Sequence, residues 1–305
     1  MNEKPILQVD GLMKRLGGKP VVNDVGFTCA AGEVVGLLGP NGAGKTTTLR
    51  MCYGFLEPDA GTVRIGEWDI RKDNEPASRA LGVCTQDETY DGDFTVRGNL
   101  LQGCRYYRPM IENRDERVDE ILEMFGLTEY ADAKPETLSG GYRRRLMIAR
   151  AVVHRPWVVF LDEPTTGLDP EARVLVWELI GTLRSEGMAV VLTTHYMDEA
   201  EWLSDRLILL KGGKIRGAGT TESLLGDVVG EHMVVVPRTG PDAEEVERWF
   251  VEKGGKHSVI LMDWHVAMGS PDLAEFVGKF PDLRYEVRPP TLDDLFLTLA
   301  KEVAQ

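Results

Sequence analysis

The chain lacks any apolar run long enough to cross a bilayer. Runs such as VVFL at 158–161 and LILL at 207–210 fall far short of the roughly 18 to 20 residues that a transmembrane helix needs. The first residues, MNEKPILQVD, also lack the apolar core of a secretory signal, because charges and a proline interrupt them. We therefore expect a cytoplasmic protein without a membrane span of its own.

Cysteines are also few, and acidic residues outnumber basic ones. The cysteines are Cys29, Cys52, Cys84 and Cys104. Their wide spacing contains no Cys-x-x-Cys pair, so it indicates neither a zinc site nor a disulfide framework, and we expect reduced, mostly buried thiols. The formal net charge of −14 disfavours general binding to nucleic acid or anionic lipid, because both attract basic surfaces. No nucleic-acid partner is expected.

The apolar residues, 43% of the chain, gather instead in short runs separated by helical patterns. The runs EVVGLLG (33–39), VVFLD (158–162) and AVVLTT (189–194) are bounded by turns, and an amphipathic stretch at 171–187 precedes the last one. Such a pattern predicts buried parallel strands in an α/β sheet over residues 1 to 225. Between 95 and 135 the pattern is only helical, which predicts a helical subdomain inserted into the sheet domain over about 90–155.

The pattern changes after residue 225. HMVVVP predicts a strand, PDAEEVERWFVEKGG a helix with Val246, Trp249 and Phe250 on one face, and HSVILMDWHVAMG a hairpin that turns near Asp263. A helix, PDLAEFVGKF, and a strand, LRYEVRPP, follow. This β-α-β-β-α-β order predicts a small ferredoxin-like α+β domain over 226–305. A last helix, TLDDLFLTLAKEV, has an apolar face that docks either within the chain or on a partner.

A glycine-rich segment with a lysine and threonines carries the strongest chemical signal. Residues 39–47, GPNGAGKTT, match G-x-x-x-x-G-K-[ST] between an apolar strand and a helical stretch. Backbone N–H groups of such a loop curl around phosphates, while Lys45 reaches the outer phosphates and Thr46 is placed to bind Mg²⁺. The predicted nucleotide-binding residues are therefore Gly39, Pro40, Asn41, Gly42, Ala43, Gly44, Lys45, Thr46 and Thr47. The alternative is a glycine-rich turn that binds nothing.

Two adjacent acids, Asp162 and Glu163, end the apolar run at 158–162. A buried carboxylate is costly without a cation, and Mg²⁺ held by Thr46 would supply one to Asp162. Because strand side chains alternate, we expect Glu163 to point elsewhere, toward an attacking water for which it is the general base. The alternative for Glu163 is a helix cap.

A P-loop, an acidic strand end and LSGG at 138–141 occur together in ATP-binding cassette (ABC) ATPases, which residues 1 to about 225 closely resemble. In that family the segment Leu138-Ser139-Gly140-Gly141 is the signature motif. It opens a helix whose amino terminus points at the γ-phosphate of ATP bound to the other protomer. The resemblance implies a P-loop NTPase fold, ATP and Mg²⁺ as ligands, and two protomers, expected to be a homodimer, closing on two ATP molecules.

The resemblance assigns further residues one by one. It implies that Gln86 senses Mg²⁺ and the attacking water, that Asp169 in GLDP lies at the dimer seam, and that His195 contacts the γ-phosphate. Two positions depart from the family pattern. Leu16 stands where members commonly stack an aromatic ring on adenine, and Tyr142 stands where glutamine usually ends the signature. The arginines at 143–145 are either a solvated helix face or a contact to phosphate or partner.

The segments LLGPNGAGKTTTLRM, DEPTTGLDPEAR, TTHYMDEAEWLSDR and RPPTLDDLFL resemble ATPase subunits of drug, polyketide and lipo-oligosaccharide exporters. The resemblance implies ATP hydrolysis that drives a separate membrane permease, with the chain peripheral on the inner face of the membrane. The helical subdomain after Gln86 is the predicted permease contact, through Tyr90, Phe94, Tyr106 and Tyr107 unless these are buried. A soluble ABC ATPase acting on ribosomes or DNA and the ATPase of an uptake transporter are the alternatives.

Overall fold

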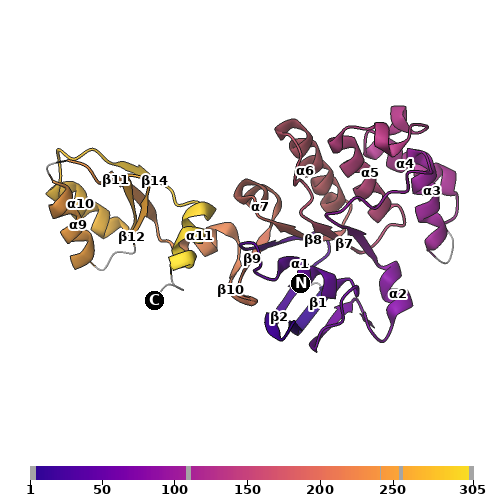
Figure 1. The fold of residues 1–305 in the computed structure, drawn as a ribbon, viewed down its shortest axis with the longest axis horizontal. Helices are drawn as coiled ribbons and strands as arrows, with labels where there is room; N and C mark the ends of the chain where they lie inside the picture. Colours follow the sequence, from indigo (N-terminus) through magenta and orange to yellow (C-terminus); the bar gives the residue numbers. More distant parts are fainter. Residues whose placement is uncertain (1–4, 108–110, 241, 254–256, 302–305) are drawn as a thin grey trace. The chain divides into compact units, whose positions relative to one another are not determined.

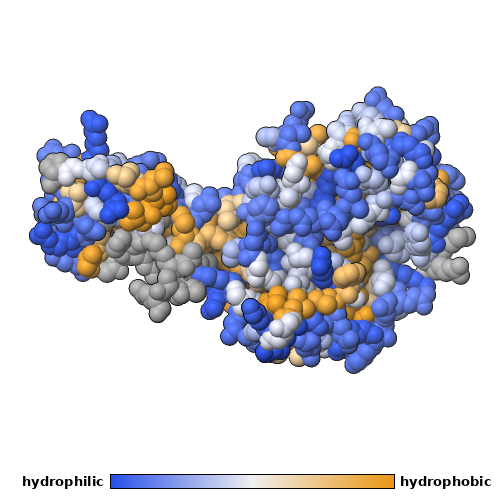
Figure 2. Space-filling view, in the orientation of Figure 1, coloured by the Kyte–Doolittle hydropathy of each residue, from blue (hydrophilic) through white to orange (hydrophobic). Residues whose placement is uncertain are grey.

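The computed structural model describes residues 5–107, 111–240, 242–253 and 257–301. The chain divides into two compact units, residues 1–218 and 219–305. Most of the surface visible in Figure 2 is hydrophilic, as expected for a chain with 28% charged residues. Among the described residues, no helix combines the length and the apolar character that a membrane span requires.

A six-stranded sheet forms the centre of the first unit (Figure 1). Its strands, in spatial order, are β10 (Lys214–Gly219), β9 (Arg206–Lys211), β3 (Val34–Leu38), β8 (Ala189–Thr194), β7 (Val158–Asp162) and β6 (Leu81–Cys84). The five strands from β9 to β6 run parallel. Every residue of β3, β7 and β8 is buried, so the parallel sheet predicted from their apolar runs is confirmed.

A second sheet is antiparallel and comes mainly from the amino-terminal part of the chain. It consists of β2 (Lys19–Cys29), β1 (Leu7–Leu16), β4 (Ala60–Ile65) and β5 (Trp68–Asp69). Buried residues of this sheet share one core with helix α1 (Lys45–Cys52) and with residues of β3 and β7. The helix that follows the P-loop is therefore held between two sheets.

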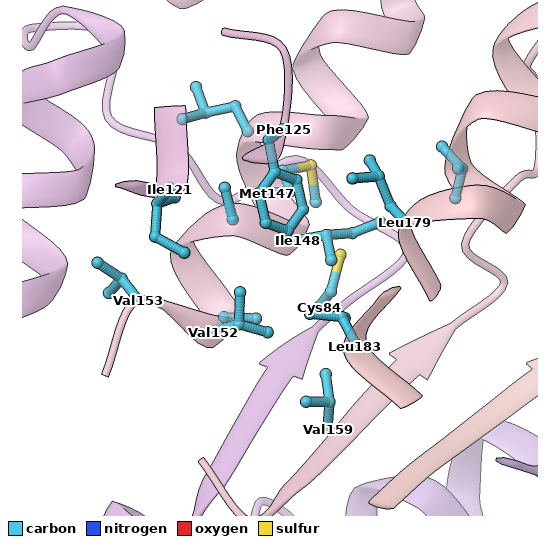
Figure 3. Close-up of a cluster of buried hydrophobic side chains, with 14 of the residues drawn as sticks. Cys84, Ile121, Phe125, Met147, Ile148, Val152, Val153, Val159, Leu179 and Leu183 are labelled. Atoms are coloured by element: carbon cyan, nitrogen blue, oxygen red, sulfur yellow. The ribbon is translucent and has the colours of Figure 1, made fainter. Parts of the chain in front are cut away.

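The helical part of the first unit contains α3 (Val96–Tyr106), α4 (Arg114–Met124) and α5 (Gly140–Val152), with 3-10 turns at Thr128–Tyr130 and Pro135–Thr137. The remaining helices of the unit are α2 (Asn74–Arg79), α6 (Pro170–Ser185) and α7 (Met197–Leu203). Phe125, Met147, Ile148 and Leu179 lie together in the buried cluster of Figure 3. This cluster fixes α5 against α6 and the sheet.

The second unit follows the predicted β-α-β-β-α-β order. Its elements are α8 (Thr221–Val228), β11 (His232–Pro237), α9 (Ala243–Glu252), β12 (His257–Ile260), β13 (Asp263–Met268), α10 (Ser270–Lys279), β14 (Glu286–Arg288) and α11 (Leu292–Lys301). The sheet order is β12-β13-β11-β14 with antiparallel neighbours, which is a ferredoxin-like arrangement. Val246, Trp249 and Phe250 are buried together, as predicted, and the hairpin turns at Leu261 and Met262.

The expectation that the cysteines are buried thiols is confirmed. Cys29, Cys52, Cys84 and Cys104 are all free and buried. Burial raises the pKa of the Cys29 thiol to about 12, since desolvation penalises the thiolate. The thiols therefore serve as small apolar core groups.

Candidate active site

The sequence-predicted catalytic elements meet at the carboxyl ends of the parallel strands. The P-loop follows β3, Gln86 follows β6, Asp162 ends β7, and His195 follows β8. The P-loop, Gln86 and His195 border a cavity of about 490 Å³, together with Glu163, which follows Asp162. It is lined by Val21, Asn41, Gly42, Ala43, Gly44, Lys45, Thr46, Thr47, Gln86, Glu163, Thr166 and His195. In a parallel α/β sheet this edge is where ligands bind.

Backbone crowding explains the glycines of the P-loop. Gly44 precedes α1 with φ 101°, and a Cβ placed there would lie 2.6 Å from the Val21 carbonyl oxygen. A Cβ at Gly39 would overlap the carbonyl oxygen of Leu210. A larger residue at either position would push the loop away from its neighbours, so glycine at 39 and 44 lets the backbone N–H groups of the loop gather above α1.

Lys45 is buried beneath this loop. Its Nζ donates to the carbonyl of Gly39 at 2.6 Å and lies 3.3 Å from that of Pro40. Burial lowers the pKa of the Lys45 ammonium, while the nearby carboxylates Glu163 and Asp162 act in the opposite direction. The side chain is thus fixed at the floor of the cavity, where an anionic phosphate would stabilise its charge.

Asp162 and Thr46 form an oxygen pair suited to a hard divalent cation. The Thr46 hydroxyl donates to Asp162 Oδ1 at 3.1 Å, and the Thr193 hydroxyl donates to the same oxygen at 2.6 Å. Among the described residues, no group of three or more His, Cys, Asp and Glu side chains is placed to hold a metal. Mg²⁺ needs no such group, because it binds through one or two protein oxygens together with substrate phosphates and water. The pair therefore fits this ion.

Glu163 lies just beyond β7 with φ 49°, a left-handed conformation that is unusual for a non-glycine residue and costs about 1 to 3 kcal/mol. Its N–H lies 3.0 Å from the Thr193 hydroxyl oxygen and 3.1 Å from the Thr193 carbonyl oxygen. The sequence expectation that strand alternation separates Asp162 from Glu163 was wrong in its reason, because the left-handed turn aims the carboxylate.

The Glu163 carboxylate faces the cavity among polar partners. Its Oε2 accepts from the Thr166 hydroxyl at 3.0 Å and from Gln86 Nε2 at 3.4 Å. His195 Nδ1 lies 3.4 Å from the same oxygen. The cap of the next helix, α6, is Asp169 and not Glu163, so the capping alternative has no support.

The signature segment does not line the cavity of its own chain. Ser139 caps α5, but its exposed side chain makes no capping hydrogen bond. A Cβ at Gly141 would lie 2.8 Å from Ala172 Cβ, so glycine lets α5 approach α6 closely, and Gly140 is exposed. Asp169 accepts from the Ala172 N–H at 2.9 Å. The cavity lining includes none of these four predicted site residues.

Leu16 is the last residue of β1, and its side chain is 45% exposed. The residue belongs to the β1–β2 hairpin, which also carries Val21 in the cavity lining. Gly17 and Gly18 form the turn of this hairpin with positive φ. Leu16 itself lies outside the lining.

The three arginines after the signature have three different environments. Arg144 is buried, so the solvated-face expectation was wrong for this residue. Arg143 Nε lies 2.8 Å from Glu88 Oε1, and the Arg145 guanidinium lies 4.0 Å from the Tyr142 ring centroid. The three side chains differ because successive residues of a helix point in different directions, and a run of three identical residues does not indicate which one is buried.

Glu199 is a second polar residue that sequence reasoning missed. It is fully buried on α7 and accepts from the Thr165 hydroxyl at 2.8 Å and from Trp177 Nε1 at 3.3 Å. Burial raises the pKa of its carboxyl above the usual range. Glu199 joins the segment after Glu163 to the helix after His195. Its position among the neighbouring acids of MDEAE gave no distinguishing signal.

The predicted aromatic contact surface is only partly exposed. Tyr106 is 76% exposed, whereas Tyr107 stacks on His154 with ring centroids 3.5 Å apart. Tyr90 and Phe94 are partly buried. Tyr106 is therefore the member of this set most available to a partner.

Comparison with known proteins identifies the family. The family model described as ABC transporter matches residues 22–166. The Nod factor export ATP-binding protein I of Burkholderia lata is 41% identical over 300 residues, which cover 97% of each chain. The protein of the same name from Paraburkholderia xenovorans is 40% identical over 96% of each chain.

Solved structures of ABC ATP-binding proteins are similar to this chain as well. The cbiO1 protein of Clostridium perfringens, part of the ABC transporter complex cbiONQ, matches with a TM-score of 0.67 and 26% identity over 74% of this chain and 92% of its own. The ATP-binding cassette MJ0796, a dimer in a post-hydrolysis state with ADP and Pi, matches with a TM-score of 0.63 and 27% identity over 70% of this chain and 98% of its own. The family and fold predicted from the sequence are confirmed: the chain belongs to the ABC transporter family as an ATP-binding protein that hydrolyses ATP.

Proposed function

We propose that this protein is the nucleotide-binding subunit of an exporter, in which ATP hydrolysis at a dimer drives a separate membrane permease. The observation that carries the proposal is one cavity in which Glu163, Gln86 and His195 face the P-loop. A general base, polar groups for a water and a phosphate cradle are the parts that phosphoryl transfer to water requires.

The side chains divide the chemistry between them. The P-loop N–H groups and Lys45 hold the β- and γ-phosphates of ATP. Glu163 accepts a proton from the attacking water as a bond forms between the water oxygen and the γ-phosphorus. The bond between that phosphorus and the bridging oxygen breaks, which leaves ADP and phosphate. Gln86 orients the water, and His195 contacts the γ-phosphate.

Thr46, Asp162 and Gln86 are the residues that would hold Mg²⁺. When bound, this ion neutralises charge on the β- and γ-phosphate oxygens. The Thr193 hydroxyl holds the Asp162 carboxylate in place through its 2.6 Å hydrogen bond.

A second protomer completes the site. Ser139, Gly140 and Asp169 are exposed and lie outside the cavity lining of their own chain, which supports a role opposite a partner's ATP. The amino terminus of α5 offers N–H groups and a partial positive charge to a γ-phosphate there. Because one chain carries both the P-loop and the signature, a homodimer satisfies both sites. The dimeric state named for the MJ0796 cassette is in line with this assembly.

Export through a separate permease is supported by the relatives, whose name describes Nod factor export. We place the chain in the cytoplasm at the inner face of the membrane, attached through that permease. The exposed Tyr106 is the proposed contact. Residues 226–305 would then be a regulatory or dimer-supporting domain, because the P-loop, Gln86, Glu163 and His195 all precede them.

Affinity purification from membranes tests the transport function. The tagged protein should copurify with a polytopic membrane protein after mild detergent extraction. Tyr106→Glu should reduce that recovery at least severalfold, whereas Phe55→Glu, at another exposed aromatic residue, should not. Recovery of ribosomes or DNA without a membrane protein would instead favour the soluble alternative.

A further inference from the structure

Arg144 connects the signature helix to the main chain around the general base. It extends from the first turns of α5, which begins directly after Ser139, and its side chain is buried. Nε donates to the carbonyl of Pro164 at 2.6 Å, and Nη1 donates to that of Thr85 at 2.8 Å. Nη2 donates to the carbonyls of Asp162 at 3.0 Å and Glu163 at 2.6 Å. One guanidinium therefore joins two loops of the site.

The planar fork of arginine suits this arrangement. A guanidinium presents five N–H donors in a rigid plane, whereas lysine offers a point charge on a flexible stem. Three of the four acceptors are the carbonyls of Glu163 and its two neighbours, Asp162 and Pro164, and the backbone of Glu163 is held at the unusual φ of 49°. The acceptor at Thr85 directly precedes Gln86. Without the Arg144 guanidinium, the backbone that positions Glu163 and Gln86 would lose these hydrogen bonds.

We propose that Arg144 is a positioning residue that holds Glu163 and Gln86 of its own chain and ties them to α5. Seating of the partner's ATP on Ser139, Gly140 and Gly141 thereby acts on the general base of the chain that supplies this signature segment. This coupling between the two sites rests on the proposed dimer. The positioning of Glu163 does not depend on a partner, because every contact lies within one chain.

The first test uses the full chain with Arg144→Gln, Arg144→Lys and the control Arg145→Gln. Arg145 lies on the same helix, but its side chain contacts Phe125 and Tyr142. Arg144→Gln should lower kcat roughly 10- to 100-fold while the Kd for ATP changes less than about twofold, since a small misplacement of a catalytic group is costly. Arg144→Lys should restore only part of kcat. Arg145→Gln should leave kcat within about twofold.

Hydrogen exchange of the same proteins, without nucleotide, gives a readout that needs no dimer. The backbone amides of Asp162, Glu163, Thr165 and Thr166 and of residues 85–87 should exchange faster in Arg144→Gln than in wild type or Arg145→Gln, while the rest of α5 keeps its protection. Unchanged exchange in these segments together with unchanged kcat would overturn the positioning role.

Mixed dimers test whether Arg144 serves the general base of its own chain or that of the partner. Two differently tagged chains are combined, one carrying Glu163→Gln so that only the other chain's Glu163 is active. The reference is the mixed dimer in which both chains keep Arg144. Arg144→Gln should lower turnover when it is in the chain with the active Glu163. It should leave turnover near that of the reference dimer when it is in the chain with Glu163→Gln. The reverse pattern would show that Arg144 serves only the signature helix and would overturn the proposal. If the chain forms no dimer of any kind with ATP, the proposed dimeric function fails, and hydrogen exchange of the single chain still decides the positioning role of Arg144.

Discussion

His195 Nδ1 lies 3.4 Å from Glu163 Oε2, although the two residues follow different strands. The register of β7 with β8 produces this proximity, because Asp162 pairs with Thr193 and both strands end at the same edge. Glu163 then turns into the left-handed region, which brings its carboxylate back toward His195. A γ-phosphate above the P-loop would meet both side chains, so we propose that the attacking water lies beside this pair.

Replacing Glu163 with glutamine should remove the general base and keep the shape of the site. We expect turnover to fall by about 10² to 10⁴, the usual contribution of general-base catalysis. ATP should still bind, and a dimer with trapped ATP should accumulate, because the phosphate contacts of Lys45 and the P-loop are unchanged. Single-turnover kinetics and size-exclusion chromatography with ATP measure the two effects.

Glu67→Gln is the matched control for Glu163→Gln. Glu67 is an exposed carboxylate in the turn before β5, so its loss should change turnover by less than about twofold. Near-normal turnover of Glu163→Gln would mean that another group accepts the proton.

Assembly in trans predicts a crosslink between protomers. The variant Asn41→Cys places a thiol in the cavity, and Ser139→Cys places one at the exposed cap of α5. Combining the two variants should give a disulfide-linked dimer with ATP under mild oxidation, whereas either variant alone should give little. The natural cysteines are buried and should not form crosslinks. A single chain that carries both Asn41→Cys and Ser139→Cys is the further test, because links formed only within such chains would rule out the trans arrangement.

Mixed catalytic defects test the same assembly by activity. A chain with Lys45→Ala and a chain with Ser139→Ala each lack one half of a composite site. Their mixture should regain partial ATPase activity, since each heterodimer contains one intact site if the two sites fire independently. Strict coupling between the sites would prevent recovery, so the crosslink decides between that outcome and a wrong assembly.

Sequence patterns predicted much of the candidate site because its chemistry is local. A phosphate cradle requires glycines and Lys45 at fixed spacing, and an acid at a buried strand end needs a cation. Parallel strands then bring such strand ends to one edge. This reasoning placed Lys45, Asp162 and Glu163 in the region where the structure has them, whereas His195 was assigned from the family resemblance.

What the sequence did not predict depends on distant contacts. Arg144 differs from Arg143 and Arg145 only in helical phase, and its acceptors lie in two other segments of the chain. Glu199 likewise owes its burial to partners on α6 and on the loop after β7. The amino-terminal antiparallel sheet was missed because bulges interrupt its period-two pattern, as between Val9 and Leu12.

Removing the second unit should leave the nucleotide site folded. A chain that ends at Gly219, the last residue of β10, retains both sheets of the first unit and the whole cavity lining. We expect the Kd for ATP to change less than about threefold, while dimerisation weakens if the second unit supports it. Nucleotide titration and analytical ultracentrifugation check both. A soluble, folded truncation that cannot bind ATP would contradict the proposed division of roles.

His154 should make the first unit sensitive to acid. Burial lowers the pKa of its imidazole to about 4, from 6.5, while its Nε2 contacts the Leu81 carbonyl at 2.9 Å. Between these values the unfolded chain binds a proton that the folded chain does not, so stability is lost as pH falls from about 6.5 to about 4. His154→Gln should remove about 2 kcal/mol of the loss between pH 7 and pH 5 in urea unfolding. His232→Gln, in the second unit, is the control. Parallel pH profiles for His154→Gln and wild type would show that folding does not shift the pKa of His154.

Leu16 should limit the contribution of the base to nucleotide affinity. An aliphatic side chain covers an adenine face by dispersion and apolar burial but offers no ring, and stacking on an aromatic residue is worth roughly 1 to 3 kcal/mol per base. Leu16 is 45% exposed at the end of β1, so a tyrosine fits there without repacking the core. Leu16→Tyr should therefore tighten ATP binding by about 5-fold or more, whereas Met13→Tyr, at another exposed position of β1, should not. In the unmodified protein ATP and GTP should bind with similar affinity, because the triphosphate contacts dominate. A strong preference for ATP together with no gain from Leu16→Tyr would mean that other residues already hold the adenine.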